Sequence, residues 1–156
     1  PESGEACLQR YRAWMDDYIR ENGVPVKPGL RELLAWLKQA HILCAVATST
    51  FTNVAIGYLK NAGVLNCFAA IVGGDQVTKS KPDPEIFQLA MRALGKQTPE
   101  TCVVFEDSRN GLLAGANGGF PVIVVPDLFD PTLELPGLCY AKCAGLDEAI
   151  DVIQNS

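Results

Sequence analysis

The chain has 156 residues, which is enough for one domain with a sizeable core. Hydrophobic residues make up 48% of it, which excludes a disordered chain, and the net charge of −5 offers no electrostatic footprint for nucleic acid or for an anionic membrane. No apolar run approaches the length of a bilayer span, and residues 1–5 contain neither the basic nor the apolar part of a signal peptide. We therefore expect a cytoplasmic protein with reduced cysteines and with no nucleic-acid or membrane partner.

The first part of the chain is predicted to form two helices. Residues 3–22 carry apolar side chains at helical spacing, and Asn22-Gly23 ends that segment. Pro28 suits the start of a second helix, which runs to about residue 40. The near-continuous apolar run 42–47 is typical of a strand that is buried on both faces.

From this strand onward, strands and helices are predicted to alternate. Further strands are expected at 69–72, 102–105 and 122–125, and further helices at 50–62, 84–94, 109–117 and 145–154. The segment 126–137 is expected to be a Pro-rich loop. Asp127 follows a strand, and a turn beside Pro126 is the preferred interpretation, with a place in the cleft as the alternative. This alternation predicts the α/β class, with a doubly wound parallel sheet and right-handed crossovers. Ligands of such sheets bind at the carboxyl ends of the strands.

An acid pair follows one of these strands directly. Glu106 and Asp107 end the apolar run 102–105, and carboxylates at the end of a buried strand are costly unless a positive charge balances them. Mg²⁺ meets that need, because it prefers oxygen ligands. Glu106 and Asp107 are therefore candidate metal ligands. The alternative is an acid pair that interacts with the dipole of the following helix.

Hydroxyl side chains follow another strand. Thr48 comes directly after the run 42–47, and the next helix starts within a few residues. Its hydroxyl, with the backbone N–H groups that follow, is suited to phosphate oxygens. Ser49 and Thr50 are weaker candidates for the same role. The alternative is an ordinary helix N-cap at Ser49 or Thr50.

A lysine lies among prolines in the segment 79–84. Lys81 precedes Pro82, which restricts the backbone of Lys81 and stiffens the segment. A stiff segment can hold one ammonium group against a transferring phosphoryl group. The alternatives are a solvated loop lysine, or the same role for Lys79.

These three segments together resemble motifs two, three and four of the haloacid dehalogenase (HAD) superfamily, in its β-phosphoglucomutase-like and phosphoglycolate-phosphatase-like branch. The patterns that carry the resemblance are Lys-Pro-Asp-Pro-x-x-Phe, which ends at Phe87, and Glu-Asp-Ser-x-x-Gly, which ends at Gly111. The resemblance implies a HAD-like Rossmannoid core over 26–156 that lacks its first strand. Residues 1–25 resemble the C-terminal part of a helical cap domain.

The resemblance also implies roles for the candidate residues. Thr48 would bind phosphate with help from Ser49 and Thr50, and Lys81 would stabilise the transferring phosphoryl group. Glu106 and Asp107 would hold Mg²⁺, with Ser108 as a possible helix cap and Gly111 as a packing residue.

One motif of the superfamily is not found. No Asp-x-Asp follows an apolar run, and that motif carries the nucleophile. Its strand would lie between the strand of Thr48 and the strand of Glu106, so Val46 and Val104 are expected to lie too far apart to pair directly. We expect either a strand from a missing N-terminal segment or a second chain between them, or a collapsed sheet in which the two strands pair.

The resemblance implies that the intact protein is an Mg²⁺-dependent phosphate-monoester hydrolase, which acts on a small phosphorylated metabolite through an aspartyl-phosphate. The chain alone is expected to be inactive, because it lacks the nucleophile. Two alternatives stay open: a sugar-phosphate mutase, and a non-catalytic phosphate-binding or interaction fragment.

Overall fold

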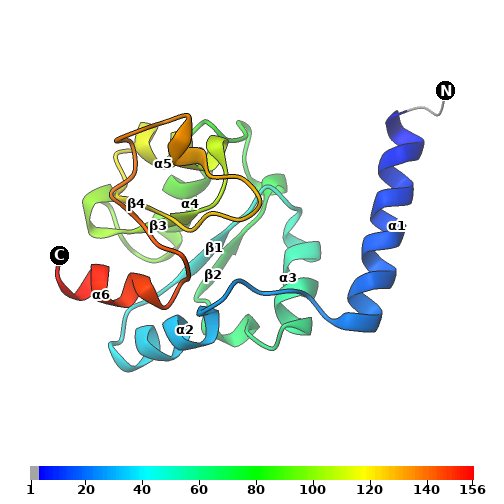
Figure 1. Cartoon of the computed structure of the whole chain (residues 1–156), viewed down its shortest axis with the longest axis horizontal. Helices are drawn as coiled ribbons and strands as arrows, with labels where there is room; N and C mark the ends of the chain where they lie inside the picture. Colours follow the sequence, from blue (N-terminus) through cyan, green and yellow to red (C-terminus); the bar gives the residue numbers. More distant parts are fainter. Residues whose placement is uncertain (1–3) are drawn as a thin grey trace.

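A computed structural model describes residues 4–156 as an α/β structure in which most of the helices pack around two parallel sheets (Figure 1). The helices are α1 (Gly4–Asn22), α2 (Leu30–Gln39), α3 (Thr52–Asn61), α4 (Glu85–Ala93), α5 (Arg109–Asn117) and α6 (Glu148–Gln154). The strands are β1 (Ala45–Ala47), β2 (Ala70–Val72), β3 (Val104–Glu106), β4 (Val122–Val124) and β5 (Ala141–Lys142). The predicted alternation of strands and helices is therefore confirmed. No helix among these residues is long and apolar enough to cross a membrane.

The strands form two separate ladders. β1 pairs with β2, and the order of the other sheet is β3-β4-β5, with every pair parallel. In the second sheet Glu106 lies opposite Val124, and in the first Ala47 lies opposite Val72. The sequence pattern predicts longer strands and misses β5, whose two residues are too few to show an alternation.

Strand β4 is central to the core because it is buried on both faces. Val122 and Val124 belong to one hydrophobic cluster, which includes side chains of α4 and α5. Ile123 points to the other face, where it joins a cluster with side chains of α2 and α6. Successive side chains of a strand alternate between faces, so three apolar residues in a row fit a strand that is covered on both sides.

Strands β1 and β3 lie in different sheets, so Val46 and Val104 do not pair. The expected separation is confirmed, and the alternative of a collapsed sheet is wrong. One hydrophobic cluster contains Val72 of β2, Val104 of β3 and Phe87 of α4, so side-chain packing joins the sheets where no ladder does. A strand from another polypeptide stays a prediction.

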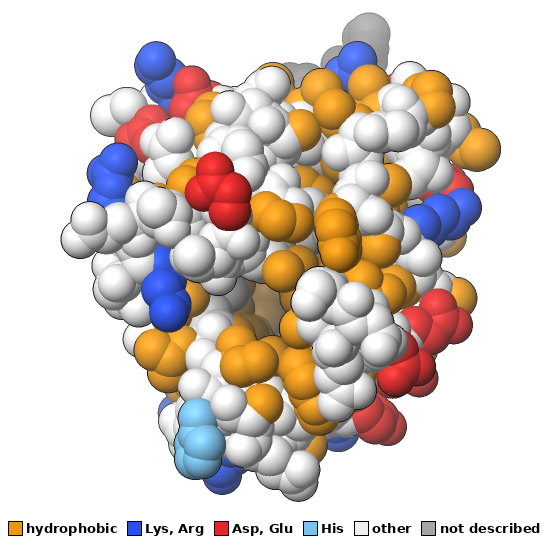
Figure 2. Space-filling view, turned by 90° about the vertical axis from the view of Figure 1, so that its left-hand side faces the viewer, with side chains coloured by type: hydrophobic (Ala, Val, Ile, Leu, Met, Phe, Trp, Pro, Cys, Tyr) orange, Lys and Arg blue, Asp and Glu red, His pale blue; other side chains and the backbone are white. Residues whose placement is uncertain are grey.

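Helix α1 lies to one side of the sheets and reaches the rest of the chain through a connector (Figure 1). None of its side chains is buried, and Tyr11, Trp14 and Tyr18 form a row of ring contacts along it. The predicted helical periodicity is confirmed from Gly4 onward, and residue 3 of the predicted range lies outside the described residues. The opposite side of the molecule is hollowed near its centre, with hydrophobic side chains around the hollow and charges of both signs scattered toward the rim (Figure 2).

A side-chain ion pair anchors β5. Lys142 of β5 donates to Asp130, and Thr132 donates to the other carboxylate oxygen of Asp130. The Lys142 ammonium, followed by the Thr132 hydroxyl, lowers the pKa of Asp130 from 3.8 to about 2.

We expect Asp130 to make a contribution to stability that depends on pH. A carboxyl group with a lowered pKa stabilises the fold above its ordinary pKa, and this contribution is lost as the pH falls through the folded value. The unaltered chain should therefore lose stability between about pH 4 and pH 2, and Asp130→Asn should not show this loss. Urea denaturation across this range measures the effect. If the free energy of unfolding depends on pH in the same way for the two proteins, the ion pair contributes nothing to stability.

Candidate active site at the carboxyl ends of the strands

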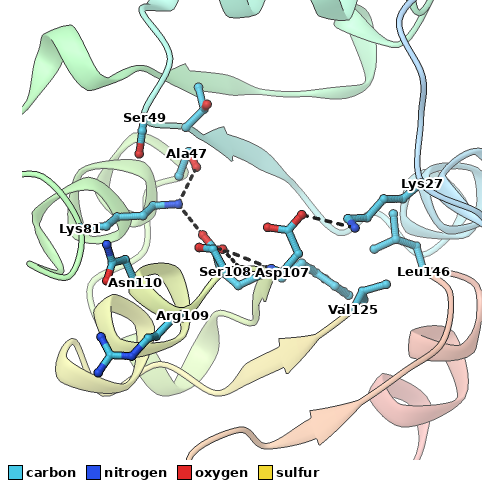
Figure 3. Close-up of a pocket in the computed structure, with 13 residues that line it drawn as sticks. Lys27, Ala47, Ser49, Lys81, Asp107, Ser108, Arg109, Asn110, Val125 and Leu146 are labelled. Carbon is cyan, nitrogen blue, oxygen red and sulfur yellow. Dashed lines mark hydrogen bonds and ion pairs between the residues drawn. The ribbon is translucent and has the colours of Figure 1, made fainter. Parts of the chain in front are cut away.

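A cavity of about 770 Å³ lies where β1 and β3 end (Figure 3). Residues from six separate parts of the chain line it, among them Lys27, Thr48, Ser49, Lys81, Glu106 and Asp107. The structure therefore brings the three candidate segments to one place, as expected for the carboxyl edge of parallel strands. Thr50 does not line this cavity.

The most enclosed polar contact of the site is the ion pair between Lys81 and Glu106. Their side chains are only 11% and 7% exposed. Lys81 Nζ also donates to the Ala47 carbonyl at 3.3 Å and lies 4.6 Å from the ring centroid of Phe87. Because Ala47 ends β1 and Glu106 ends β3, this ammonium group bridges the two sheets. Lys79 is exposed and pairs with Asp83, so it does not reach this contact.

The second oxygen of Glu106 is also occupied. Oε2 accepts from the Asp107 N–H at 3.2 Å and from the Ser108 hydroxyl at 3.0 Å. Ser108 also caps α5, because its Oγ accepts from the Gly111 N–H at 3.0 Å. Gly111 lies so close that a Cβ there would overlap the Glu106 carboxyl group. The helix start thus fixes the direction of the Glu106 side chain.

Asp107 is more open than its neighbour, and a lysine that the sequence analysis missed contacts it. Lys27 Nζ lies 3.3 Å from Asp107 Oδ2 and 3.7 Å from Asp127 Oδ2. Lys27 lies in the connector between α1 and α2, and no sequence pattern in this connector marks a site. Asp127, interpreted from the sequence as a turn residue, faces this lysine at the edge of the site. The only local signal for either residue is that Asp127 follows a strand.

The segment after β1 presents backbone and hydroxyl groups to the cavity. Thr48 N donates to the Val72 carbonyl, and its Oγ1 accepts from the Thr50 N–H at 3.1 Å. Neither Ser49 nor Thr50 caps α3. Asp75, from the turn after β2, accepts from both the N–H and the hydroxyl of Thr52. The N–H group of Thr52 is therefore satisfied by Asp75, without Thr48 or Ser49. The Ser49 side chain is exposed and lies beside Lys81 (Figure 3).

The acid pair fits a magnesium site that has only one or two protein ligands. Within residues 4–156 no group of three or more His, Cys, Asp or Glu residues gathers to hold a metal. Mg²⁺ usually keeps several waters and binds through one or two carboxylates together with substrate phosphate oxygens. Asp107 offers a half-exposed carboxylate on the cavity wall, whereas both oxygens of Glu106 already accept hydrogen bonds. Asp107 is thus the better placed of the two candidate ligands.

Comparisons with known proteins agree with the fold and with the motifs. The family model for the haloacid dehalogenase-like hydrolases matches residues 3–119. The phosphorylated carbohydrates phosphatase of Thermotoga maritima is 42% identical over 103 residues, which cover 66% of this chain and 45% of that protein. The CbbY protein of Cereibacter sphaeroides is 38% identical over 122 residues, which cover 76% of this chain and 53% of that protein. The chain thus spans about half the length of these relatives.

Solved structures extend the similarity over nearly the whole chain. A putative β-phosphoglucomutase from Thermotoga maritima superposes with a TM-score of 0.82 at 31% identity, covering 99% of this chain and 71% of that one. CbbY from Rhodobacter sphaeroides, in complex with phosphate, superposes with a TM-score of 0.79 at 30% identity, covering 95% and 68%. The family model covers most of the chain, and the motifs that first suggested the resemblance lie within its range. The chain belongs to the haloacid dehalogenase-like hydrolase family.

Proposed function

We propose that this chain forms the core of an Mg²⁺-dependent phosphatase that hydrolyses the monoester of a small phosphorylated metabolite, in the first place a phosphorylated carbohydrate. The observation that carries the proposal is the enclosed Lys81–Glu106 pair at the wall of a cavity that Thr48, Ser49 and Asp107 also line. The phosphatase of Thermotoga maritima described above supports the carbohydrate class.

In this function the chain supplies the groups that stabilise a transferring phosphoryl group. Such a group spreads negative charge over its oxygens, so that most of the catalysis comes from positioning and from fixed positive charge. The Lys81 ammonium, which Glu106 and the Ala47 carbonyl hold in place, supplies that charge. The Thr48 hydroxyl and the exposed Ser49 side chain, which follow β1 and also line the cavity, supply hydrogen bonds.

Asp107 and Glu106 would hold the magnesium ion. When bound, Mg²⁺ would supply positive charge beside the phosphoryl oxygens. Asp107 would contribute a carboxylate oxygen directly, and Glu106 would contribute mainly by fixing the position of Lys81 and of the α5 start.

The nucleophile would come from a strand that is not part of this sequence. As the resemblance implies, an aspartate on that strand would attack phosphorus, and water would then hydrolyse the aspartyl-phosphate. Among the described residues, β1 and β3 each pair with a neighbour on one side only. A strand between them would bring its carboxyl end to the cavity, beside Lys81 and Asp107. It would belong to a longer form of the polypeptide or to a second chain.

A sugar-phosphate mutase is the second candidate. The similarity to the putative β-phosphoglucomutase of Thermotoga maritima favours it. As the resemblance implies, a mutase would pass the phosphoryl group to a sugar phosphate instead of to water. Product analysis with a bisphosphate activator separates the two: a mutase returns an isomeric sugar phosphate, and a phosphatase returns inorganic phosphate.

The chain by itself is expected to bind phosphate without turning over an ester, because positioning groups do not replace a covalent step. p-Nitrophenyl phosphate with Mg²⁺ tests turnover, and calorimetry with inorganic phosphate tests binding. Robust turnover that survives rigorous purification would mean that the chain carries its own nucleophile. A folded chain that does not bind phosphate at all would contradict the proposed site.

Asp107→Asn is expected to weaken Mg²⁺ binding strongly, and in a complete protein to reduce kcat sharply, because a hard cation loses an anionic ligand. Glu106→Gln should weaken it less. Calorimetric titration with Mg²⁺ measures the binding, and Asp16→Asn on α1, remote from the cavity, is the charge-matched control. If both site variants bind Mg²⁺ as the unaltered chain does, the acid pair is structural.

A further inference from the structure

Lys27 lies between two carboxylates at the mouth of the cavity. Its Nζ is 3.3 Å from Asp107 Oδ2 and 3.7 Å from Asp127 Oδ2. It approaches Asp107 from the side opposite Lys81, so each carboxylate of the acid pair has its own lysine (Figure 3).

The two lysine pairs differ in how far water reaches them. Lys81 and Glu106 are almost fully enclosed, whereas the Lys27 and Asp107 side chains are 28% and 42% exposed and Asp127 is 70% exposed. Exposed ion pairs are weak, because water and salt screen them. A cation from solution can therefore replace Lys27 at Asp107 far more easily than it can replace Lys81 at Glu106.

We infer that Lys27 is a tethered counter-ion that competes with the divalent cation for Asp107, and that Lys27 pairs with Asp127 when the cation binds. Because Asp107 is a metal ligand only under the proposed function, this inference rests on that function. Without the metal, Lys27 neutralises Asp107. With the metal bound, the Lys27 ammonium stays within reach of Asp127, which limits the repulsion between the two cations.

The competition predicts opposite effects for the two partners. Lys27→Met removes the competitor and should raise the affinity for Mg²⁺ by about 1.5- to fivefold, the range expected for losing one exposed ion pair. Asp127→Asn removes the alternative partner of Lys27 and should lower the affinity. In a Lys27→Met background the effect of Asp127→Asn should shrink, because Asp127 acts mainly through Lys27.

The test is calorimetric titration of the full chain with Mg²⁺ at constant ionic strength. Lys27→Arg keeps the charge and should bind nearly as the unaltered chain does. Lys79→Met removes a lysine that pairs with Asp83 away from the cavity, and it should leave the affinity unchanged. Circular dichroism of each variant checks that it is folded.

The outcomes separate this inference from the proposed function. If Asp107→Asn strongly weakens Mg²⁺ binding and Lys27→Met raises the affinity, both the metal site and the competition stand. If Asp107→Asn strongly weakens binding and Lys27→Met leaves the affinity unchanged or lowers it, only the competition is overturned. If the unaltered chain does not bind Mg²⁺, or if Asp107→Asn binds it normally, the metal site itself is overturned. If Lys79→Met raises the affinity for Mg²⁺ as much as Lys27→Met does, the effect of Lys27 comes from net charge and not from its contact with Asp107. That result also overturns the competition.

Discussion

Lys81→Ala is expected to lower the free energy of unfolding by about 3 kcal/mol, because it leaves the enclosed Glu106 carboxylate without its cation. It should also abolish phosphate binding by the chain, and in a complete enzyme it should reduce kcat by about 10²-fold or more, the scale for one preorganised charge. Urea denaturation measures the first effect, and calorimetry with inorganic phosphate measures the second.

Two controls separate the loss of the site from the loss of the fold. Lys79→Ala removes an exposed lysine of the same segment and should change stability by less than about 0.5 kcal/mol. The double variant Lys81→Met/Glu106→Gln removes both charges together, so it should recover most of the stability without recovering phosphate binding. Normal phosphate binding by this double variant would contradict the role of Lys81, and a larger effect at Lys79 would mean that the motif is misplaced.

Gly111→Ala is expected to destabilise the protein by about 2 kcal/mol, although alanine is the better helix former by about 1 kcal/mol. The new Cβ would overlap the Glu106 carboxyl group. That group is the end of a flexible side chain, but Lys81 and Ser108 hold it in place, so it cannot move aside without losing those contacts. The same displacement should weaken the binding of phosphate.

Gly57→Ala is the matched control for this substitution. Gly57 lies in the exposed interior of α3, where a Cβ meets nothing within 4 Å. This change should therefore stabilise the chain by about 0.5–1 kcal/mol through helix propensity alone. Thermal unfolding of both variants is the measurement. If Gly111→Ala stabilises as Gly57→Ala does, the close approach of α5 to Glu106 does not constrain the site.

Short-range patterns were enough to predict the gathering of Thr48, Lys81, Glu106 and Asp107. Each follows a strand or lies in a rigid segment with prolines, and parallel strands end at one edge of the sheet. Local patterns and this one rule of topology therefore predict that the residues lie together.

Contacts between distant segments were not predictable from the sequence. Lys27 meets Asp107 across 80 positions of the chain, and nothing in its own connector marks it. The cap of α3 shows the same limit. The sequence offers Ser49 or Thr50 as an alternative cap, whereas in the fold Asp75 accepts from the first N–H group of this helix. Strand β5 was missed because its pairing partner β4, and not its own two residues, makes it a strand.

Helix α1 has a consequence for how this protein would unfold. A helix of 19 residues with no buried side chain is marginal in water, so its amide hydrogens should exchange through local fraying rather than through global opening. The chain has two tryptophans, of which Trp14 lies on α1 and Trp36 packs against the core beside α6. Tryptophan emission would therefore report two events with separate midpoints: a broad, weakly cooperative melting of α1 and a sharp transition of the sheets. Fitted as one transition, such a curve would understate the cooperativity of the core, and a Trp14→Phe variant would restore a signal that belongs to the core alone.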